Sequence, residues 1–298
     1  MKKIINISLT IFISLAVLFT SCDLDAPSQS SAESKVVLSS YALAEGLVMG
    51  IHQSFAETNS YRGRFLPFYG INSDIEWINN ISPAQINDDG KYALTGYATS
   101  PTNTQMNTDN NAWAKFYEGI ERANLAIDGL RKFGDIENSP AMAQLLGEAL
   151  TLRTVIYLDL IKGWGDVPLR LEPISSETIN LPRTDRDIIY KQMLADLGEA
   201  ENLVAWPNGS SITTSTERVN KAFVKGLMAR IALYASGYSQ RADGVRRSSD
   251  PELSVANMYK LAKDKSLEVI NSGANTLGSF EQNFRLLCQD NVQAGKES

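Results

Sequence analysis

The sequence predicts an all-α protein in which helices stack as antiparallel pairs, interrupted by one long irregular loop insertion. Three observations lead to this prediction. Apolar residues recur every three or four positions over several segments, which is the period of an amphipathic helix. Capping residues and glycines mark the expected helix ends. Between residues 58 and 108 the helical period fades among Asn, Ser, Gly, Pro and Thr, which indicates irregular structure.

The first 31 residues precede the expected folded body. Two lysines lead into an apolar run from Ile4 to Phe19, which is too short to span a bilayer as a helix and is typical of a signal peptide. The small residues before Cys22 resemble a bacterial lipobox, so we expect a signal peptide over residues 1–21 and a lipidated Cys22. The alternative is a plain signal peptide followed by an incidental cysteine. Residues 22–31 then form a polar tether, and the folded body covers residues 32–298.

The helices of the body are expected in a fixed order. A first helix runs from about Ala32 to Glu57, and further helices follow the irregular region over the ranges Asp109–Phe133, Ser139–Gly163, Thr184–Leu203, Glu217–Gly237 and Pro251–Gly273. We expect the capping-box pairs Thr184–Asp187 and Thr214–Glu217 to begin two of them. Neighbouring helices would pack as tetratricopeptide-like pairs, each burying its face against the next. The strict tetratricopeptide consensus is absent.

The segment from Glu148 to Pro173 carries the clearest helix and the clearest helix end. Apolar residues form two adjacent stripes along it, which predicts a helix packed on both sides. Ser139 is a good N-cap and Pro140 suits the first helical position. Gly163 and Gly165 both offer positions for a C-terminal cap, and proline blocks continuation soon after them. We therefore expect this segment to be scaffold and place neither its tryptophan nor its last aspartate in a binding site.

An ordered set of residues in this segment matches a known pattern, close to E-A-x-x-L-R-A-x-x-Y-x-D-L-V-x-x-[WYF]-G-D-V-P-L. The matching positions are Glu148, Ala149, Leu152, Arg153, Tyr157, Asp159, Leu160, Gly165, Asp166, Val167, Pro168 and Leu169. The pattern resembles that of the SusD/RagB family. The resemblance implies a surface-exposed outer-membrane lipoprotein, anchored to the membrane through Cys22, that binds glycans and passes them to a SusC-like TonB-dependent transporter. Family members continue past the end of this chain, so we expect it to be an N-terminal portion.

The irregular region holds the candidate ligand contacts. A flat aromatic ring can pack on the apolar face of a sugar, while amides and carboxylates bind its hydroxyl groups, and long loops in compact proteins are usually functional. On this basis the selected residues are Tyr69, Asn72, Asp74, Trp77 and Tyr92. The alternative for each ring is that it only pins the loop to the helices. Trp113 is expected in the core rather than against a sugar.

Composition argues against several other functions. The chain has 34 acidic and 28 basic residues, a net charge of −6, which argues against nucleic-acid binding. Its single histidine, His52, cannot build a histidine metal site, so we expect neither metal nor cofactor. No pair of carboxylates stands out as the acid and base of a glycosidase, so we do not expect an enzyme. The remaining alternatives are a peptide-binding member of the same family and a tetratricopeptide-type envelope scaffold.

Overall fold

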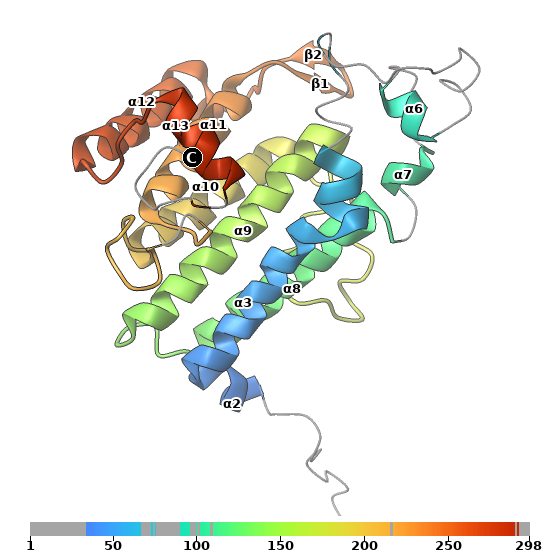
Figure 1. Cartoon of the computed structure of the whole chain (residues 1–298). Coiled ribbons are helices and arrows are strands. Elements are labelled where there is room, and N and C mark those ends of the chain that lie inside the picture. The colour runs from blue at the N-terminus through green and yellow to red at the C-terminus, as the bar shows by residue number, and fades with distance from the viewer. Residues whose placement is uncertain are drawn as a thin grey trace, which may run out of the picture.

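The computed structural model in Figure 1 describes residues 34–66, 73, 75, 90–95, 100, 102–107, 110–214, 217–289 and 291. Long helices dominate it, as the sequence predicts. They pack side by side in one array, in the order α3 (Tyr41–Ala56), α8 (Ala112–Phe133), α9 (Pro140–Trp164), α10 (Arg186–Leu203), α11 (Lys221–Ser236) and α12 (Val255–Ser272). The predicted stacked helical pairs are therefore confirmed.

Helix α9 is the centre of this array and packs against α3, α8 and α10. Its ends are the predicted ones. The Ser139 side chain accepts a hydrogen bond from the Met142 amide, and Pro140 is the first helical residue. Gly165 ends the helix at φ +76°, and its amide donates to the Ile161 carbonyl oxygen at 2.9 Å. Because α9 has neighbours on several sides, most of its residues are buried.

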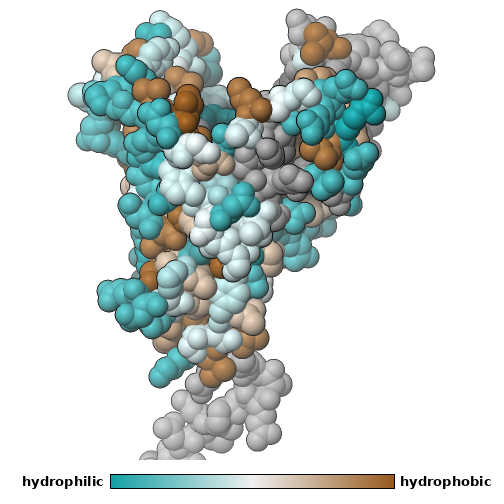
Figure 2. Space-filling view, turned by 60° about the vertical axis from the view of Figure 1, so that its left-hand side comes forward, coloured by the Kyte–Doolittle hydropathy of each residue, from teal (hydrophilic) through white to brown (hydrophobic). Residues whose placement is uncertain are grey.

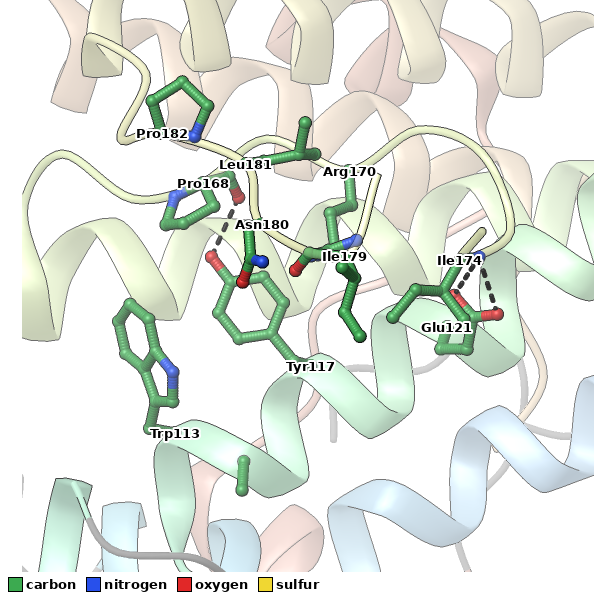
Figure 3. A pocket seen from close by; sticks show the side chains of 11 residues that line it. Trp113, Tyr117, Glu121, Pro168, Arg170, Ile174, Ile179, Asn180, Leu181 and Pro182 are labelled. Atoms are coloured by element: carbon green, nitrogen blue, oxygen red, sulfur yellow. Dashed lines mark hydrogen bonds between the residues drawn. The ribbon is translucent and has the colours of Figure 1, made fainter. Parts of the chain in front are cut away.

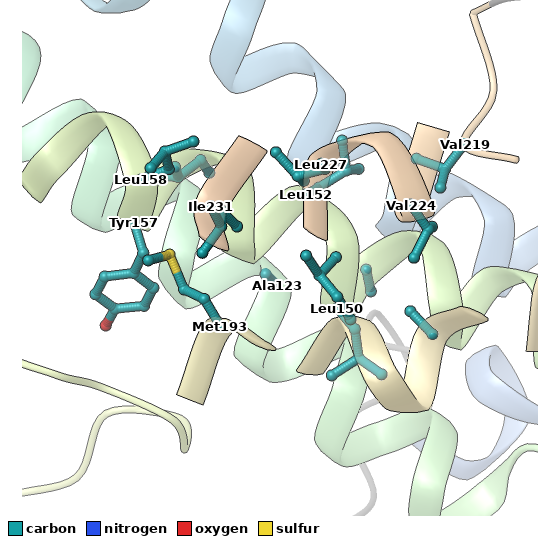
Figure 4. Packing of buried hydrophobic residues seen from close by; sticks show 14 of the residues in the cluster. Ala123, Leu150, Leu152, Tyr157, Leu158, Met193, Val219, Val224, Leu227 and Ile231 are labelled. Carbon is teal, nitrogen blue, oxygen red and sulfur yellow. The ribbon is translucent and has the colours of Figure 1, made fainter. Parts of the chain in front are cut away.

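The hydrophobic core runs along α9 and continues into the next two helices. Figure 4 shows Leu150, Leu152 and Leu158 of α9 close to side chains of α10 and α11, among them Met193, Val224, Leu227 and Ile231. These residues are at most 7 % exposed. Burial of this size accounts for the stacking, because an isolated amphipathic helix leaves its apolar stripe in water.

Several helix starts differ from the predictions. The first helix is broken at Ser40, so that α2 (Ser34–Ser39) precedes α3. The predicted capping boxes at Thr184 and Thr214 do not form. Asp185, Asn220 and Ser254 cap α10, α11 and α12 instead, by accepting from the amides of Asp187, Phe223 and Asn257. In each case a second capping residue lies within a few positions of the expected one, and the helix begins there.

The segment after α11 departs from the all-α architecture. It forms a hairpin of β1 (Ser239–Arg241) and β2 (Gly244–Arg246), followed by the short helix η2 (Pro251–Leu253). The guanidinium of Arg241 is buried and donates to both carboxylate oxygens of Asp187, at 3.0 and 2.6 Å. A buried ion pair therefore links α10 to the hairpin.

In the part that the structure describes, the irregular region between residues 58 and 108 contains short helices. They are η1 (Thr58–Phe65), which is kinked at Ser60, α6 (Gly90–Thr95) and α7 (Thr104–Asn107). Tyr61 and Phe65 of η1 are buried against Phe116 of α8, with ring centroids 4.5 and 5.2 Å away. Rings of this region do pin it to the helices, as the alternative interpretation proposed.

The last helix, α13 (Phe280–Cys288), has no buried residue. Phe280 and Phe284 stack on each other while remaining 84 % and 57 % exposed. Cys288 at the end of this helix is exposed. Figure 2 shows hydrophobic residues reaching the surface in the upper part of the molecule. Among the described residues, no helix combines the length and the apolar character needed to cross a membrane.

Candidate ligand-binding pocket

An open pocket of about 690 Å³ lies between the first half of α8 and the connector that joins α9 to α10 (Figure 3). Helix α8 contributes Trp113, Tyr117 and Glu121 to its wall, and the connector contributes Arg170, Asn180 and several apolar residues. The wall thus combines two aromatic rings with an amide and two charged groups. This combination is typical of a site that recognises a ligand with both apolar faces and hydrogen-bonding groups.

The three residues of α8 line the pocket because they are spaced by four positions, which places them on one helix face. The ring of Trp113 lies 5.0 Å from that of Tyr117 and 5.4 Å from that of Trp164, in a tilted and an edge-to-face arrangement. Trp164 packs in turn against Phe116 and Phe65. Trp113 is therefore held from behind by the core while its remaining surface faces the pocket.

Two side chains of α8 fasten the connector over the helix. The Tyr117 hydroxyl donates to the Pro168 carbonyl oxygen at 2.8 Å. Burial raises the pKa of Tyr117, so the phenol stays protonated and remains a donor. Both carboxylate oxygens of Glu121 accept from the Ile174 amide, at 3.0 and 3.1 Å. Figure 3 shows these contacts at different points along the pocket, with Glu121 farther from Trp113 than Tyr117 is.

Buried polar groups hold the connector from its other side. The Asn124 side-chain amide donates to the carbonyl oxygens of Arg170 and Glu172, and Arg153 donates to that of Leu171 at 3.1 Å. The Tyr157 hydroxyl accepts from the Arg170 amide at 2.6 Å and donates to the Arg170 carbonyl oxygen at 3.0 Å. The backbone on this side of the pocket is therefore fixed by α8 and α9 before any ligand binds.

Arg170 is the half-buried charged residue of the connector wall. One terminal nitrogen, Nη2, donates to the Ile179 carbonyl oxygen. The other, Nη1, is buried and has no hydrogen-bond partner among the described residues, none of whose carboxylates forms an ion pair with this guanidinium. In Figure 3 Arg170 and Asn180 lie above the ring of Tyr117. The pocket therefore contains a positive charge that the neighbouring residues leave without a counter-ion.

This pocket offers a ligand aromatic surface and hydrogen-bonding groups from its lining residues. It has no histidine or cysteine among its lining residues. In the part of the chain that the structure describes, no group of three His, Cys, Asp or Glu side chains is placed to hold a metal ion. Glu121 is the carboxylate of the pocket wall and it is engaged by the backbone.

Most of the residues selected from the sequence fall outside the described residues: Cys22, Tyr69, Asn72, Asp74 and Trp77. They remain predictions. Tyr92 lies on α6 and is half-buried, next to the buried Ala93 and Leu94. It does not line the pocket beside α8.

Sequence reasoning missed the pocket residues themselves. Trp113 was expected in the core, and the structure corrects this in part, because the ring packs on the core and also lines the pocket. The spacing of Trp113, Tyr117 and Glu121 could have indicated a mixed aromatic and acidic face. The connector from Leu171 to Arg183 could have indicated a covering segment, because it is long and contains two prolines.

Comparison with known proteins shows which proteins share this sequence pattern and architecture. The model of a SusD-like family, described as "Starch-binding associating with outer membrane", matches residues 24–233. SusD-like protein P38 from Formosa agariphila is 28 % identical over 245 residues, which is 80 % of this chain and 44 % of that protein. SusD-like protein P25 from the same organism is 29 % identical over 113 residues, 38 % of this chain and 21 % of that one.

Solved structures share the fold at low sequence identity. A SusD homologue from Bacteroides thetaiotaomicron superposes with a TM-score of 0.68 at 16 % identity, covering 86 % of this chain and 45 % of its own. Surface glycan-binding protein A from Bacteroides uniformis gives 0.60 at 19 % identity, covering 80 % and 48 %. A laminarin-binding SusD-like protein gives 0.57 at 18 % identity, covering 79 % and 44 %.

This chain spans less than half the length of each of these relatives. Within that span the stacked helices, the ordered pattern from Glu148 to Leu169 and the family match over residues 24–233 agree with one another. The chain belongs to the SusD-like family.

Proposed function

We propose that this chain is part of a glycan-binding outer-membrane protein that captures oligosaccharides and passes them to a SusC-like TonB-dependent transporter. The observation that carries the proposal is the pocket beside α8, where Trp113 and Tyr117 face polar groups of the connector. Membership of a family described as starch-binding and associated with the outer membrane supports the ligand class and the location. The names of a laminarin-binding and a glycan-binding neighbour support the same ligand class.

The pocket suits a sugar for physical reasons. The apolar C–H face of a pyranose can pack on an aromatic ring, and burying that face removes apolar surface from water. Its hydroxyl groups can bond Asn180 and Arg170, which carry donors and, in the amide, an acceptor. Because the helices and the connector are already held in place, a sugar would bind with little loss of protein conformational freedom.

Membrane attachment is the second part of the proposal. A signal peptide over residues 1–21, a lipid on Cys22 and a polar tether over residues 22–31 would place the helical body at the cell surface. The family match begins at residue 24, just after the proposed lipid-bearing cysteine. Binding and delivery require no covalent chemistry on the ligand, so we do not propose a catalytic residue.

Calorimetric titration of the purified chain with oligosaccharides from starch and from laminarin tests the proposal. At least one class should bind, and Trp113→Ala should weaken binding by roughly tenfold, the loss expected when an aromatic platform is removed. Tyr259→Ala is the matched control, because this ring is 56 % exposed on α12 and lies outside the pocket. Trp77→Ala tests the irregular region separately.

The other possible outcomes of these titrations would support a different binding site or a different function. Unchanged affinity in Trp113→Ala with a loss in Trp77→Ala would move the site from the pocket to the irregular region. Binding of peptides without binding of sugars would favour the peptide-binding alternative. Binding of neither, together with protection from protease added to intact cells, would favour an envelope scaffold.

A further inference from the structure

We infer that the pocket beside α8 selects acidic glycans, those that carry a uronate carboxylate or a sulfate ester, and that Arg170 is the residue that selects them. The inference rests on the proposed glycan-binding function and adds a substrate class to it. Its starting point is the state of the Arg170 guanidinium, whose charge no described carboxylate neutralises.

Arg170 differs from the buried arginines of the same protein in its lack of a carboxylate partner among the described residues. Arg153, Arg186 and Arg241 each donate to an aspartate, at 2.7, 2.9 and 2.6 Å respectively. Arg170 instead gives one N–H to the Ile179 carbonyl oxygen, and its buried Nη1 has no partner among the described residues. A partly buried charge without a counter-ion is unfavourable, so this site favours an anionic partner.

The charge of the guanidinium identifies the kind of ligand group that suits it. Its N–H groups form a planar fork, but Nη1 is closed off by the protein and Nη2 donates to Ile179, so a ligand in the pocket would meet this cation mainly through its charge. A neutral sugar hydroxyl would leave the positive charge uncompensated. An acidic group on the ligand would compensate it, and the attraction between opposite charges is stronger at a half-buried site than in bulk water.

The rest of the pocket fixes where the acidic group lies. Glu121 also lines the pocket and repels anions, but its oxygens accept from Ile174 at a position farther from Trp113 (Figure 3). An acidic substituent is therefore favoured near Arg170 and Asn180, with the sugar ring over Tyr117 and Trp113. The whole chain carries a net charge of −6, so attraction to an acidic glycan has to come from this local charge.

Paired ligands give the sharpest test. The full chain is titrated with acidic oligosaccharides, such as galacturonate trimers and sulfated galactan oligosaccharides, and with their methyl-esterified or desulfated counterparts. The acidic member of a pair should bind about tenfold more tightly or better than its neutral counterpart, because only it carries a charge that Arg170 attracts. Added salt should weaken the acidic member and leave the neutral one nearly unchanged.

Three variants connect this preference to Arg170. Arg170→Gln should abolish the difference between paired ligands, and Arg170→Lys should keep part of it, since the charge remains and the fork is lost. Arg183→Gln is the matched control, because Arg183 is an exposed arginine of the same connector outside the pocket wall. It should leave the preference intact. If Arg170→Gln does not fold, the paired ligands on the unaltered chain still decide the question.

The two proposals fail in different ways. Equal binding of acidic and neutral members, or binding of neutral members alone, overturns the acidic preference and leaves glycan binding standing. A preference that survives in Arg170→Gln shows that another residue selects the charge and overturns the role of Arg170. Absence of binding by every oligosaccharide, acidic or neutral, refutes both proposals together.

Discussion

Replacing Arg153 by Met tests the buried polar network that joins α8, α9, α10 and the connector. The side chains of Arg153 and Asp196 are 3 % and 8 % exposed, and Nη2 donates to Oδ2 at 2.7 Å. The same guanidinium donates to the Asn124 side-chain oxygen at 2.8 Å and to the Leu171 carbonyl oxygen at 3.1 Å. One substitution therefore removes contacts to three separate parts of the chain.

The expected cost follows from what the substitution leaves behind. Asp196 keeps a hydrogen bond from Gln192 at 2.7 Å but loses its counter-ion, and two acceptors lose a donor. Removing one partner of a buried ion pair costs about 3–5 kcal/mol. A domain of ordinary stability has about 5–15 kcal/mol in total, so Arg153→Met should remove a large part of the free energy of unfolding. Urea denaturation followed by circular dichroism measures this difference.

Two further variants make the result interpretable. Arg131→Met breaks the pair with Glu199, whose side chains are 50 % and 40 % exposed, and should cost less than about 1 kcal/mol. Arg153→Met combined with Asp196→Leu replaces the buried pair by apolar groups and should recover much of the loss. If Arg153→Met costs no more than Arg131→Met, the buried network does not hold these helices together and the reasoning is refuted.

Two predictions concern the end of α9, where Asp166 accepts from Arg186 Nε at 2.9 Å and Gly165 has φ +76°. Burial acts to raise the pKa of Asp166, but hydrogen bonds from the Arg186 side chain and backbone outweigh it and lower the pKa. The stabilisation of the folded state by this ion pair is therefore fully present above the ordinary pKa of an aspartate, near pH 4. It is lost as the pH falls through the lowered pKa of the folded state. Asp166→Ala should lower the free energy of unfolding by about 1 kcal/mol at pH 7 and by progressively less in acid, and it should leave ligand affinity unchanged. A loss of affinity at equal stability would instead place Asp166 in the binding site. Gly165→Ala should cost about 1–2 kcal/mol in thermal melting, because a Cβ there has an unfavourable φ and would lie 2.5 Å from Arg186 Nη2. A neutral effect would show that the turn can relax.

The central helix was predictable because its end signals are local. Ser139 and Pro140 have the predicted roles at its start, and of the two glycines offered at its end, Gly165 rather than Gly163 is the cap. The starts of α10 and α11 were mispredicted because each region offers more than one capping residue within a few positions. Which one caps depends on where packing places the helix. That information comes from distant parts of the chain and is absent from the local sequence.

The candidate site was harder to predict for a similar reason. Helical spacing puts Trp113 and Tyr117 on one face, but it cannot show which segment will cover that face. The connector covers it because Asn124 and Arg153 hold its carbonyl groups, at separations of 18 to 48 residues along the chain. Tyr92, selected for its composition, lies on α6 outside this pocket. The residues at 69, 72, 74 and 77 stay predictions.

The position of the family pattern relative to the pocket explains why the pattern identifies the family without identifying the ligand. Arg153 and Tyr157, which belong to the pattern, bind the backbone of the connector rather than its side chains. The pattern ends at Leu169, and the amide of Thr184 returns to Val167 at 3.0 Å to close the connector into a loop. Arg170 and Asn180 lie inside that loop, after the pattern has ended. Asn124 and Tyr157 hold the Arg170 backbone, so the side chain at this position can change with the ligand while the backbone stays in place. Such a change would remove the hydrogen bond from the Arg170 side chain to Ile179.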